Sequence, residues 1–182
     1  MRLAISRKIN GDVCHSGYRH DPVKIRLADV TDEEFLWRIL GEAVHWRGEP
    51  YDAGGLASAP QLAKYLSGWG RAGDAGVVVE VENRPVGAAW YRLFPADDPG
   101  YGFISEHTPE LSIGVQREWR KRGIGRRLLT SLELVAREQG YAALSLSVEE
   151  ANPARRLYEQ LGYVRAGQGG GAWTMVKDLV AS

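Results

Sequence analysis

The stretch from Leu111 to Gly140 places the strongest constraint on how this chain can fold. It begins with the apolar segment Leu-Ser-Ile-Gly-Val (111–115), which is typical of a buried strand, and continues with a polar, basic segment. Gly123 and Gly125 then open a run whose apolar residues recur at helical spacing. The sequence therefore predicts a strand, a short basic turn and a helix.

The turn between this strand and this helix suits an anionic ligand. Its sequence is Arg120-Lys121-Arg122-Gly123-Ile124-Gly125, followed by Arg126. Backbone N–H groups at a helix start favour an anion, and glycines let a ligand approach the main chain closely. The spacing matches neither the three-glycine dinucleotide pattern nor the P-loop. We interpret residues 120–126 as a phosphate cradle, with a solvent-exposed basic turn as the alternative.

The remaining periodic segments predict a single domain with a mixed sheet. We expect strands at 23–27, 77–81, 86–94, 143–148, 163–166 and 173–177, and helices over 31–48, 61–69 and 152–162. Thr31 and Glu34 have the spacing of a capping box at the start of the first helix. The helix between strands 111–115 and 143–148 predicts a parallel crossover, whereas the short connections elsewhere predict antiparallel pairs. The fold class is therefore α+β or mixed α/β.

Composition excludes several classes of function. The formal net charge is zero, which argues against nucleic acid as the main partner. Cys14 is the single cysteine, and its neighbours His15 and His20 are too few to form a metal site, so we expect no metal. No stretch is long enough to span a bilayer, so we expect a cytoplasmic protein with no membrane partner. We expect residues 1–22 to form a flexible or loosely packed arm, and residues 23–182 to form the domain.

A second motif follows the basic turn and the strand expected at 143–148. Asn152-Pro-Ala-Arg-Arg-Leu-Tyr158-Glu-Gln-Leu-Gly162-Tyr163 resembles the late helix of the GNAT acetyltransferases, and residues 120–125 resemble the acetyl-CoA loop of that family. Asn152 precedes Tyr158 by six residues, where the family more often has seven. The resemblance covers roughly residues 23–180 and implies the GNAT fold, with a mostly antiparallel mixed sheet and about four flanking helices. It also implies acetyl-CoA as co-substrate and suggests a homodimer.

The resemblance assigns roles to the residues that match these motifs. It implies that residues 120–126 hold the CoA pyrophosphate and that Asn152 contacts the cofactor. A backbone N–H within Ile113-Gly114-Val115, next to a strand bulge, would stabilise the thioester oxyanion. Tyr158 would donate a proton to the departing thiolate.

The general base is less constrained than the general acid. Glu110 is the first choice because it opens the strand on the acceptor side, and Glu106, His107 and Glu149 are alternatives. Aromatic and charged residues near the expected acceptor site include Trp37, His45, Trp46, Tyr51, Asp52, Trp90 and Tyr91.

The acceptor itself is expected to be a primary amine, either on a small molecule or on a protein or peptide. The expected activity is therefore N-acetyl transfer by direct attack on acetyl-CoA. The alternative function is a non-catalytic acyl-CoA-binding sensor or interaction module on the same fold.

Overall fold

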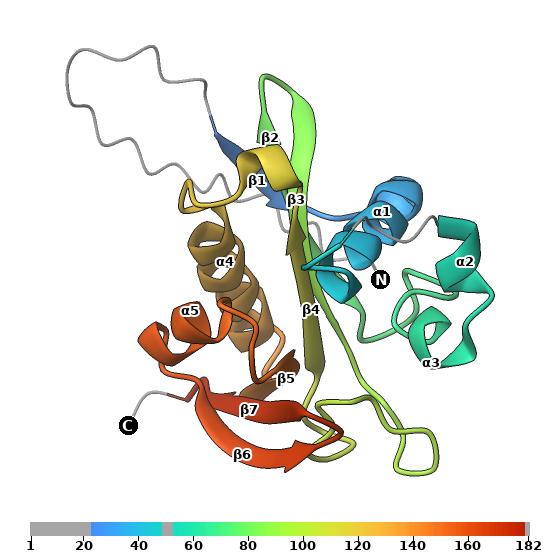
Figure 1. Ribbon diagram of the computed structural model, residues 1–182, viewed down its shortest axis with the longest axis vertical. Helices are drawn as coiled ribbons and strands as arrows, with labels where there is room; N and C mark the ends of the chain where they lie inside the picture. Colours follow the sequence, from blue (N-terminus) through green and yellow to red (C-terminus); the bar gives the residue numbers. More distant parts are fainter. Residues whose placement is uncertain (1–22, 49–52, 181–182) are drawn as a thin grey trace.

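Seven strands form one sheet in the spatial order β1-β2-β3-β4-β5-β7-β6 (Figure 1). The computed structural model describes residues 23–48 and 53–180, and the arm expected at residues 1–22 lies outside them. The strands are β1 Lys24–Leu27, β2 Ala75–Val81, β3 Arg84–Arg92, β4 Glu110–Val115, β5 Ala143–Glu149, β6 Val164–Gly169 and β7 Ala172–Asp178. Only the β4–β5 pair is parallel among these strands, so the expected mixed, mostly antiparallel sheet is confirmed.

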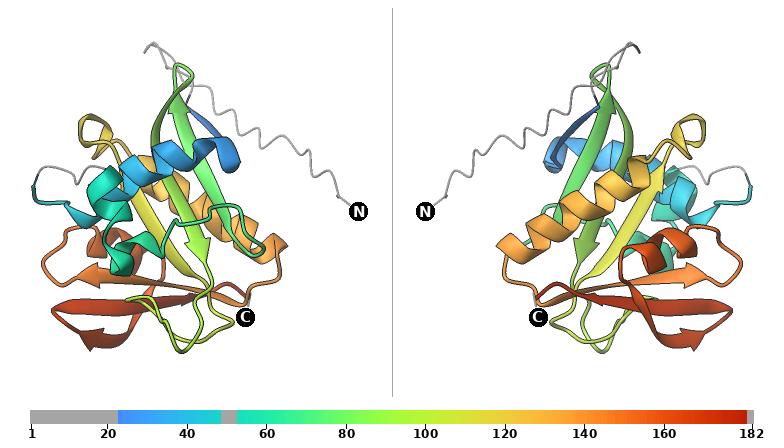
Figure 2. Two further views of the ribbon diagram at one scale, coloured as in Figure 1. Left: turned by 90° about the vertical axis from the view of Figure 1, so that its right-hand side faces the viewer. Right: turned by 90° about the vertical axis from the view of Figure 1, so that its left-hand side faces the viewer.

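Within residues 23–48 and 53–180, five α-helices cover the two faces of this sheet. They are α1 Glu33–Val44, α2 Ala53–Ala57, α3 Pro60–Ala63, α4 Ile124–Glu138 and α5 Arg155–Gln160. Helices α4 and α5 lie on one face and α1, α2 and α3 on the other (Figures 1 and 2). Because α4 connects parallel strands β4 and β5, it is the crossover that the sequence predicts. None of the helices in the described ranges is long and apolar enough to cross a membrane.

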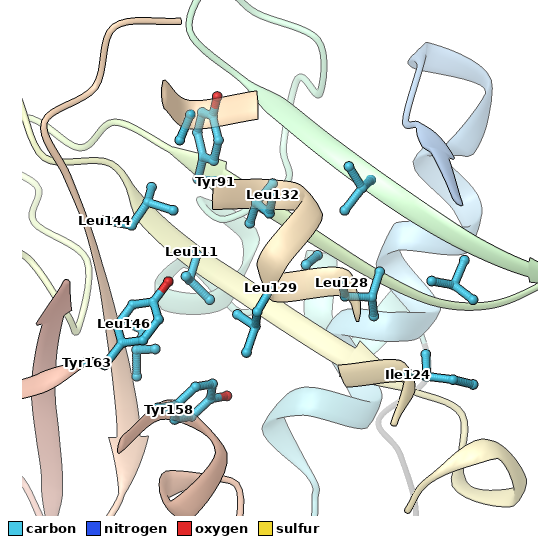
Figure 3. Packing of buried hydrophobic residues seen from close by; sticks show 14 of the residues in the cluster. Tyr91, Leu111, Ile124, Leu128, Leu129, Leu132, Leu144, Leu146, Tyr158 and Tyr163 are labelled. Carbon is cyan, nitrogen blue, oxygen red and sulfur yellow. The ribbon is translucent and has the colours of Figure 1, made fainter. Parts of the chain in front are cut away.

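Each face of the sheet has its own apolar core. Leu128, Leu129 and Leu132 of α4 pack against the strands on one face, and Figure 3 shows this cluster. On the other face, Ile39 of α1 packs against Trp90 of β3. Burying one such aliphatic side chain contributes about 1.5–3 kcal/mol. The alternation of apolar residues along β3 and β4 therefore fixes which side chains each helix layer can reach.

The start of the first helix differs from the sequence prediction. The capping box is formed by Asp29 and Asp32 instead of Thr31 and Glu34, because Asp32 accepts the N–H of Asp29 at 2.9 Å while Asp29 accepts the N–H of Thr31 at 2.8 Å. Helix α1 consequently begins at Glu33, after a 3₁₀ turn over Val30–Asp32.

The segment after α1 is more broken than its pattern suggests. Helix α2 lies in a region expected to be a loop, and the helix expected over 61–69 ends at Ala63. The backbone then turns through Gly68 and Gly70, whose φ values of 67° and 90° end helical periodicity. This turn brings Tyr65 and Trp69 into the core under the sheet.

Strands β4 and β5 pair at one point and then separate. Their only registered pair is Glu110 with Ser145, and the Ser145 N–H donates to the Pro109 carbonyl at 3.0 Å. Beyond that pair the two strands diverge, as Figure 1 shows, while β4 stays paired with β3 along its whole length. The centre of the sheet therefore opens as a V toward Val115.

Candidate active site

The turn before α4 presents a run of backbone donors. The N–H groups of Lys121 through Arg126 have no hydrogen-bond acceptor within the part of the chain that the structure describes. The first intrahelical bond at this end is from the Arg127 N–H to the Gly123 carbonyl, at 3.2 Å. A helix N-terminus with unsatisfied N–H groups binds phosphate, so this turn has the donor set of the expected cradle.

The two glycines of the turn have different structural reasons. Gly123 is the N-cap of α4 with φ of 78°, and a Cβ there would meet nothing within 4 Å. The left-handed backbone and the open space at this position suit close approach of a ligand. A Cβ on Gly125 would lie 3.2 Å from Leu157 Cδ2, so Gly125 lets α5 pack closely on α4. Ile124 between them is buried and anchors the helix start in the core.

The basic side chains of the turn lie in different directions. The guanidinium of Arg120 donates to Glu42 Oε2 at 2.6 Å and to the Val115 carbonyl at 3.0 Å, and its backbone N–H bonds to Arg117. These bonds direct the Arg120 side chain toward α1, where it anchors the loop. Its direct contact with a cofactor stays a prediction.

The other three basic side chains of this turn are solvent-exposed. Lys121 has a left-handed φ of 61°, and Arg122 stacks on the Trp119 ring at 4.7 Å. Arg126 donates to Gln160 of α5 at 2.6 Å. All three place positive charge around the unpaired N–H groups, which strengthens the attraction of the turn for an anion.

The edge of β4 at the V-shaped opening supplies further donors. The Gln116 N–H bonds to the Val86 carbonyl at 3.0 Å, so the antiparallel alternation directs the N–H groups of Ile113 and Val115 away from β3. They point to the side from which β5 has diverged. These are the positions that the sequence predicts for an oxyanion donor.

Gly114, between these two residues, has a packing role. A Cβ at this position would lie 2.7 Å from the Ile39 carbonyl oxygen, so the glycine allows α1 to lie directly on β4. The expected bulge is absent here, because the β3–β4 register runs without a shift from Gly87–Val115 to Arg92–Glu110. The opening beside Ile113–Val115 arises from the divergence of β5 instead.

Tyr158 of α5 lies at the edge of the core formed with α4. Its ring packs edge-on to Tyr163 with centroids 6.0 Å apart, and Figure 3 shows the two hydroxyl groups pointing in different directions. Burial raises the pKa of Tyr158, so the phenol stays protonated at physiological pH. The position of this tyrosine is compatible with proton donation.

Asn152 lies in the turn before α5. Its side-chain oxygen accepts the Ala154 N–H at 2.9 Å, and the helix itself begins three residues later than expected, at Arg155. Because the oxygen caps this turn, its amide nitrogen is the group available for a ligand. The predicted cofactor contact of Asn152 remains a prediction.

Glu110 begins β4, on the face covered by α1 and α3. Its side chain is only 3% exposed, and its Oε1 accepts a hydrogen bond from the Tyr65 hydroxyl at 2.8 Å. Burial raises the pKa of Glu110 to about 7, although the Tyr65 hydrogen bond acts in the opposite direction. A carboxylate that titrates near neutrality is suited to general base catalysis.

The alternative bases differ from Glu110 in their environments. Glu106 and His107 are exposed in the loop before β4, where Glu106 accepts the Ala96 N–H at 3.0 Å. Glu149 is exposed at the end of β5. Of the four, Glu110 alone is buried.

The comparison with known families decides what this arrangement belongs to. The Acetyltransferase (GNAT) family matches residues 40–163, which is more than half of the chain. The chain belongs to the GNAT acetyltransferase family. A comparison with curated proteins gave no significant match.

Solved GNAT structures share this fold. The ribosomal-protein-alanine N-acetyltransferase of Brucella melitensis is 29% identical, and the similarity covers 85% of this chain and 99% of that one with a TM-score of 0.59. YncA of Salmonella typhimurium, solved with acetyl-CoA, is 24% identical over 88% and 96% of the two chains, with a TM-score of 0.64. PaiA N-acetyltransferase of Thermoplasma acidophilum, solved with coenzyme A, is 16% identical over 86% and 99%, with a TM-score of 0.61.

A pocket in this GNAT domain lies between the end of α1 and the end of β5. It has a volume of about 230 Å³ and is lined by residues 44–48 and Glu149. His45 and Trp46 line it, as the expected acceptor site requires, but Arg47 already stacks on the Trp46 ring at 4.4 Å. Tyr51 and Asp52 lie outside the described residues.

The remaining aromatic residues expected at the acceptor site lie elsewhere. Trp37 and Trp90 belong to the core under α1. The prediction for Tyr91 is wrong, because this residue faces α4 on the opposite side of the sheet, where its hydroxyl bonds to Gln139 at 3.0 Å. The strand alternation at positions 90 and 91 places neighbouring residues on opposite faces.

Tyr65 is a site residue that sequence reasoning missed. It contacts Glu110 across 45 positions in the chain, and it follows a short helix that the sequence pattern extends too far. Ser145 was also missed; it is the β5 residue that pairs with Glu110 across the parallel crossover. Strand pairing brings Ser145 to Glu110, and the packing of the turn after α3 on the sheet brings Tyr65 there.

Proposed function

We propose that this GNAT domain transfers the acetyl group of acetyl-CoA to a primary amine by direct attack. The observation that carries this proposal is the run of N–H groups at 121–126 that find no acceptor among the described residues, beside the V-shaped opening of β4 and β5. The N–H groups suit a pyrophosphate. The opening suits an extended thiol-bearing arm, which can bond to the free edge of β4 where β5 does not. Acetyl-CoA joins both chemical groups in one molecule and supplies the activated acetyl group.

The residues at the opening have separate tasks in this proposal. The N–H groups of Ile113 and Val115 are fixed donors at the strand edge, suited to the arm of the cofactor and to the thioester oxygen as it gains negative charge. Tyr158 donates a proton to the departing sulfur, since burial keeps its phenol neutral. Glu110 accepts the proton that a charged amine must lose before it can attack.

The acceptor is proposed to enter from the side of α1. Glu110 lies on this face of the sheet at the closed end of the V, whereas the pocket lined by His45, Trp46 and Glu149 lies at its open end, so the pocket does not itself contain the proposed base. The Brucella melitensis neighbour is named for the alanine of a ribosomal protein, which makes a protein N-terminus one acceptor class to test. Small amines form the second class.

Calorimetry with acetyl-CoA tests the cradle. The Gly123→Asp variant places a carboxylate among the N–H groups, so we expect its affinity to fall at least about tenfold, which corresponds to 1.4 kcal/mol. Gly140→Asp is the matched control, because Gly140 lies at the other end of α4 with φ of 85° and open space around it. The control carries the same charge and the same backbone strain but should bind as the wild type does.

Release of free thiol with a panel of amines tests turnover in the same samples. The panel contains small primary amines and peptides that begin with alanine. Thiol release with one of these classes supports acetyl transfer and names the acceptor class. Binding without release across the panel would favour the acyl-CoA sensor, and absence of binding by the wild type would overturn the proposal.

A further inference from the structure

Tyr65 joins the buried carboxylate to the loop that covers it. Its hydroxyl donates to Glu110 Oε1 at 2.8 Å and accepts the Tyr101 N–H at 2.7 Å. Because the Tyr101 N–H occupies the acceptor side of the hydroxyl, the phenol proton is directed to Glu110. The ring is held in place by Phe94, with centroids 5.0 Å apart, and by Tyr101, stacked at 6.3 Å.

The two oxygens of Glu110 therefore differ. Oε1 has a fixed side-chain donor, whereas buried Oε2 receives no side-chain hydrogen bond among the described residues. The backbone N–H of Gly102 also faces the carboxyl and lowers its pKa, but its geometry falls short of a regular hydrogen bond to Oε2. A Cβ on Gly100 would lie only 2.0 Å from Oε2, so the absence of a side chain at Gly100 makes room for this oxygen. The Ser145 hydroxyl, on the β5 residue paired with Glu110, is also buried and has no hydrogen-bond partner in the described ranges.

The charged groups around Glu110 are already engaged. Arg92 of β3 is in register with Glu110, but its guanidinium bonds to Asp74 at 2.6 and 3.0 Å. Lys64 lowers the pKa of Glu110 by its charge, yet its ammonium bonds to Asp98 of the covering loop at 2.9 Å. The Tyr65 phenol is thus the one side-chain donor that bonds directly to the carboxylate in the described residues.

We propose that Tyr65 is a positioning residue for acetyl transfer, which holds Glu110 Oε1 so that Oε2 receives the proton of the acceptor amine. This inference rests on the proposed function, in which Glu110 is the base. In the step, an N–H bond of the acceptor ammonium breaks and its electron pair stays on nitrogen. An O–H bond forms at Oε2, the carboxylate becomes a neutral acid, and the nitrogen lone pair is then available for attack on the thioester.

The Tyr65 hydrogen bond should favour the ionised form of Glu110. A donor to a carboxylate stabilises its charge, and its removal leaves burial as the dominant influence on the pKa. The Tyr65→Phe variant should therefore need a higher pH to ionise Glu110. A purely structural tyrosine would instead change stability and leave this ionisation where it is.

The test compares Tyr65→Phe with Tyr91→Phe. Tyr91 is also buried, and its replacement by Phe removes one hydroxyl hydrogen bond, to Gln139. Tyr91 lies on the opposite face of the sheet from Glu110. We expect the acid limb of the kcat pH profile to move up by about one unit in Tyr65→Phe alone, because a tenfold change in ionisation is one pKa unit. The KM for acetyl-CoA should stay within about twofold, and the two profiles should converge at high pH.

A direct titration of Glu110 separates this inference from the proposed function. The side-chain carboxyl ¹³C signal, assigned with Glu110→Gln, reports the pKa without any turnover. An upward shift in Tyr65→Phe supports the hydrogen bond even if no amine is acetylated, in which case the proposed function fails and the positioning role in transfer fails with it. An unchanged pKa, or an equal shift in Tyr91→Phe, would overturn the inference.

Gly100→Ala provides a second variant that keeps Tyr65. Its Cβ would displace Oε2, so we expect kcat to fall at least tenfold while the dissociation constant for acetyl-CoA is retained. Wild-type kcat in this variant would show that Oε2 needs no open space, and it would contradict its assignment as the proton acceptor.

Discussion

Two buried acidic clusters in this domain differ in whether an arginine bonds to each carboxylate. At the β1–β2 edge, Arg26 bonds to both oxygens of Asp32 at 2.7 Å and to Glu80 at 2.6 Å. At the start of β4, Arg92 lies beside Glu110 in register but bonds to Asp74 instead. Both clusters place an arginine next to acidic residues, yet only the first satisfies all of the carboxylates with charge.

The difference appears in the protonation of the acids. The Arg26 hydrogen bond lowers the pKa of Glu80. For Asp32, burial acts to raise the pKa, but the Arg26 guanidinium and the Asp29 N–H together lower it below its ordinary value. Burial dominates at Glu110, where the only side-chain partner is a neutral phenol. Burial therefore leaves a carboxylate with a pKa near neutrality only where no arginine bonds to it.

Loss of the carboxylate should have its largest effect on turnover at β4. Glu110→Gln should lower kcat/KM for the acceptor by about 10²–10⁴-fold, the usual contribution of a general base. Glu80→Gln is the matched control, which should cost stability and leave kcat/KM intact. Steady-state thiol release checks both variants, and equal activity of Glu110→Gln and the wild type would remove Glu110 from the mechanism.

The buried ion pair between Arg92 of β3 and Asp74 should contribute to stability. Both side chains of the Asp74–Arg92 pair are 1% exposed, so Asp74→Asn would leave a buried guanidinium with only the carbonyls of Lys64 and Ser67. Breaking such a pair costs about 3–5 kcal/mol. Urea denaturation measures this cost, and a change below about 1 kcal/mol would mean that Arg92 finds a new partner, for which Glu110, its register partner on β4, is a candidate.

The two clusters should also give opposite dependences of stability on pH. Because the folded pKa of Glu110 is raised from 4.5 to about 7, its unfavourable burial of charge is absent below pH 4.5 and complete above pH 7. Glu110→Gln should therefore gain stability relative to the wild type as pH rises through this window, by about 3 kcal/mol at most.

Asp32→Asn provides the comparison with the opposite sign. Its folded pKa is lowered, so the contribution of Asp32 to stability is present above its unfolded pKa of 3.8 and is lost as pH falls through the folded pKa. The variant should be less stable than the wild type by about 1–2 kcal/mol at pH 7, with the gap closing in acid. Denaturation curves from pH 3 to pH 8 test both variants, and parallel curves would contradict the assigned protonation states.

The sequence was sufficient for the elements that local pattern dictates. The strand at 111–115, the basic turn and the helix from Ile124 follow from periodicity and glycine placement, and they carry the cradle. The capping box was misplaced because Asp29–Asp32 and Thr31–Glu34 share the same spacing, and only the contact of Asp32 with Arg26 favours the first.

The environment of Glu110 could not be predicted in this way. Its protonation depends on burial and on the hydrogen bonds from Tyr65 and the Gly102 N–H, which lie on separate segments and reach Glu110 only in the folded domain. Likewise, the sequence suggested a ligand or bulge role for Gly114, whereas its contact with Ile39 shows a packing role. Local pattern thus identified the acidic residue, and tertiary contacts determined its chemistry.

Because β4 and β5 are joined by a single registered pair, we expect the sheet to behave as two cooperative units. One unit contains β1 to β4, and the other contains β5, β7 and β6, each built from antiparallel pairs. Apart from Glu110–Ser145, no backbone ladder in the described strands connects the two units, so α4 and its core side chains carry most of the coupling. Amide hydrogen exchange should therefore reveal two opening events of different free energy in the ligand-free protein. A bound molecule that spans the V would act as an extra strand, and exchange from both units should slow together.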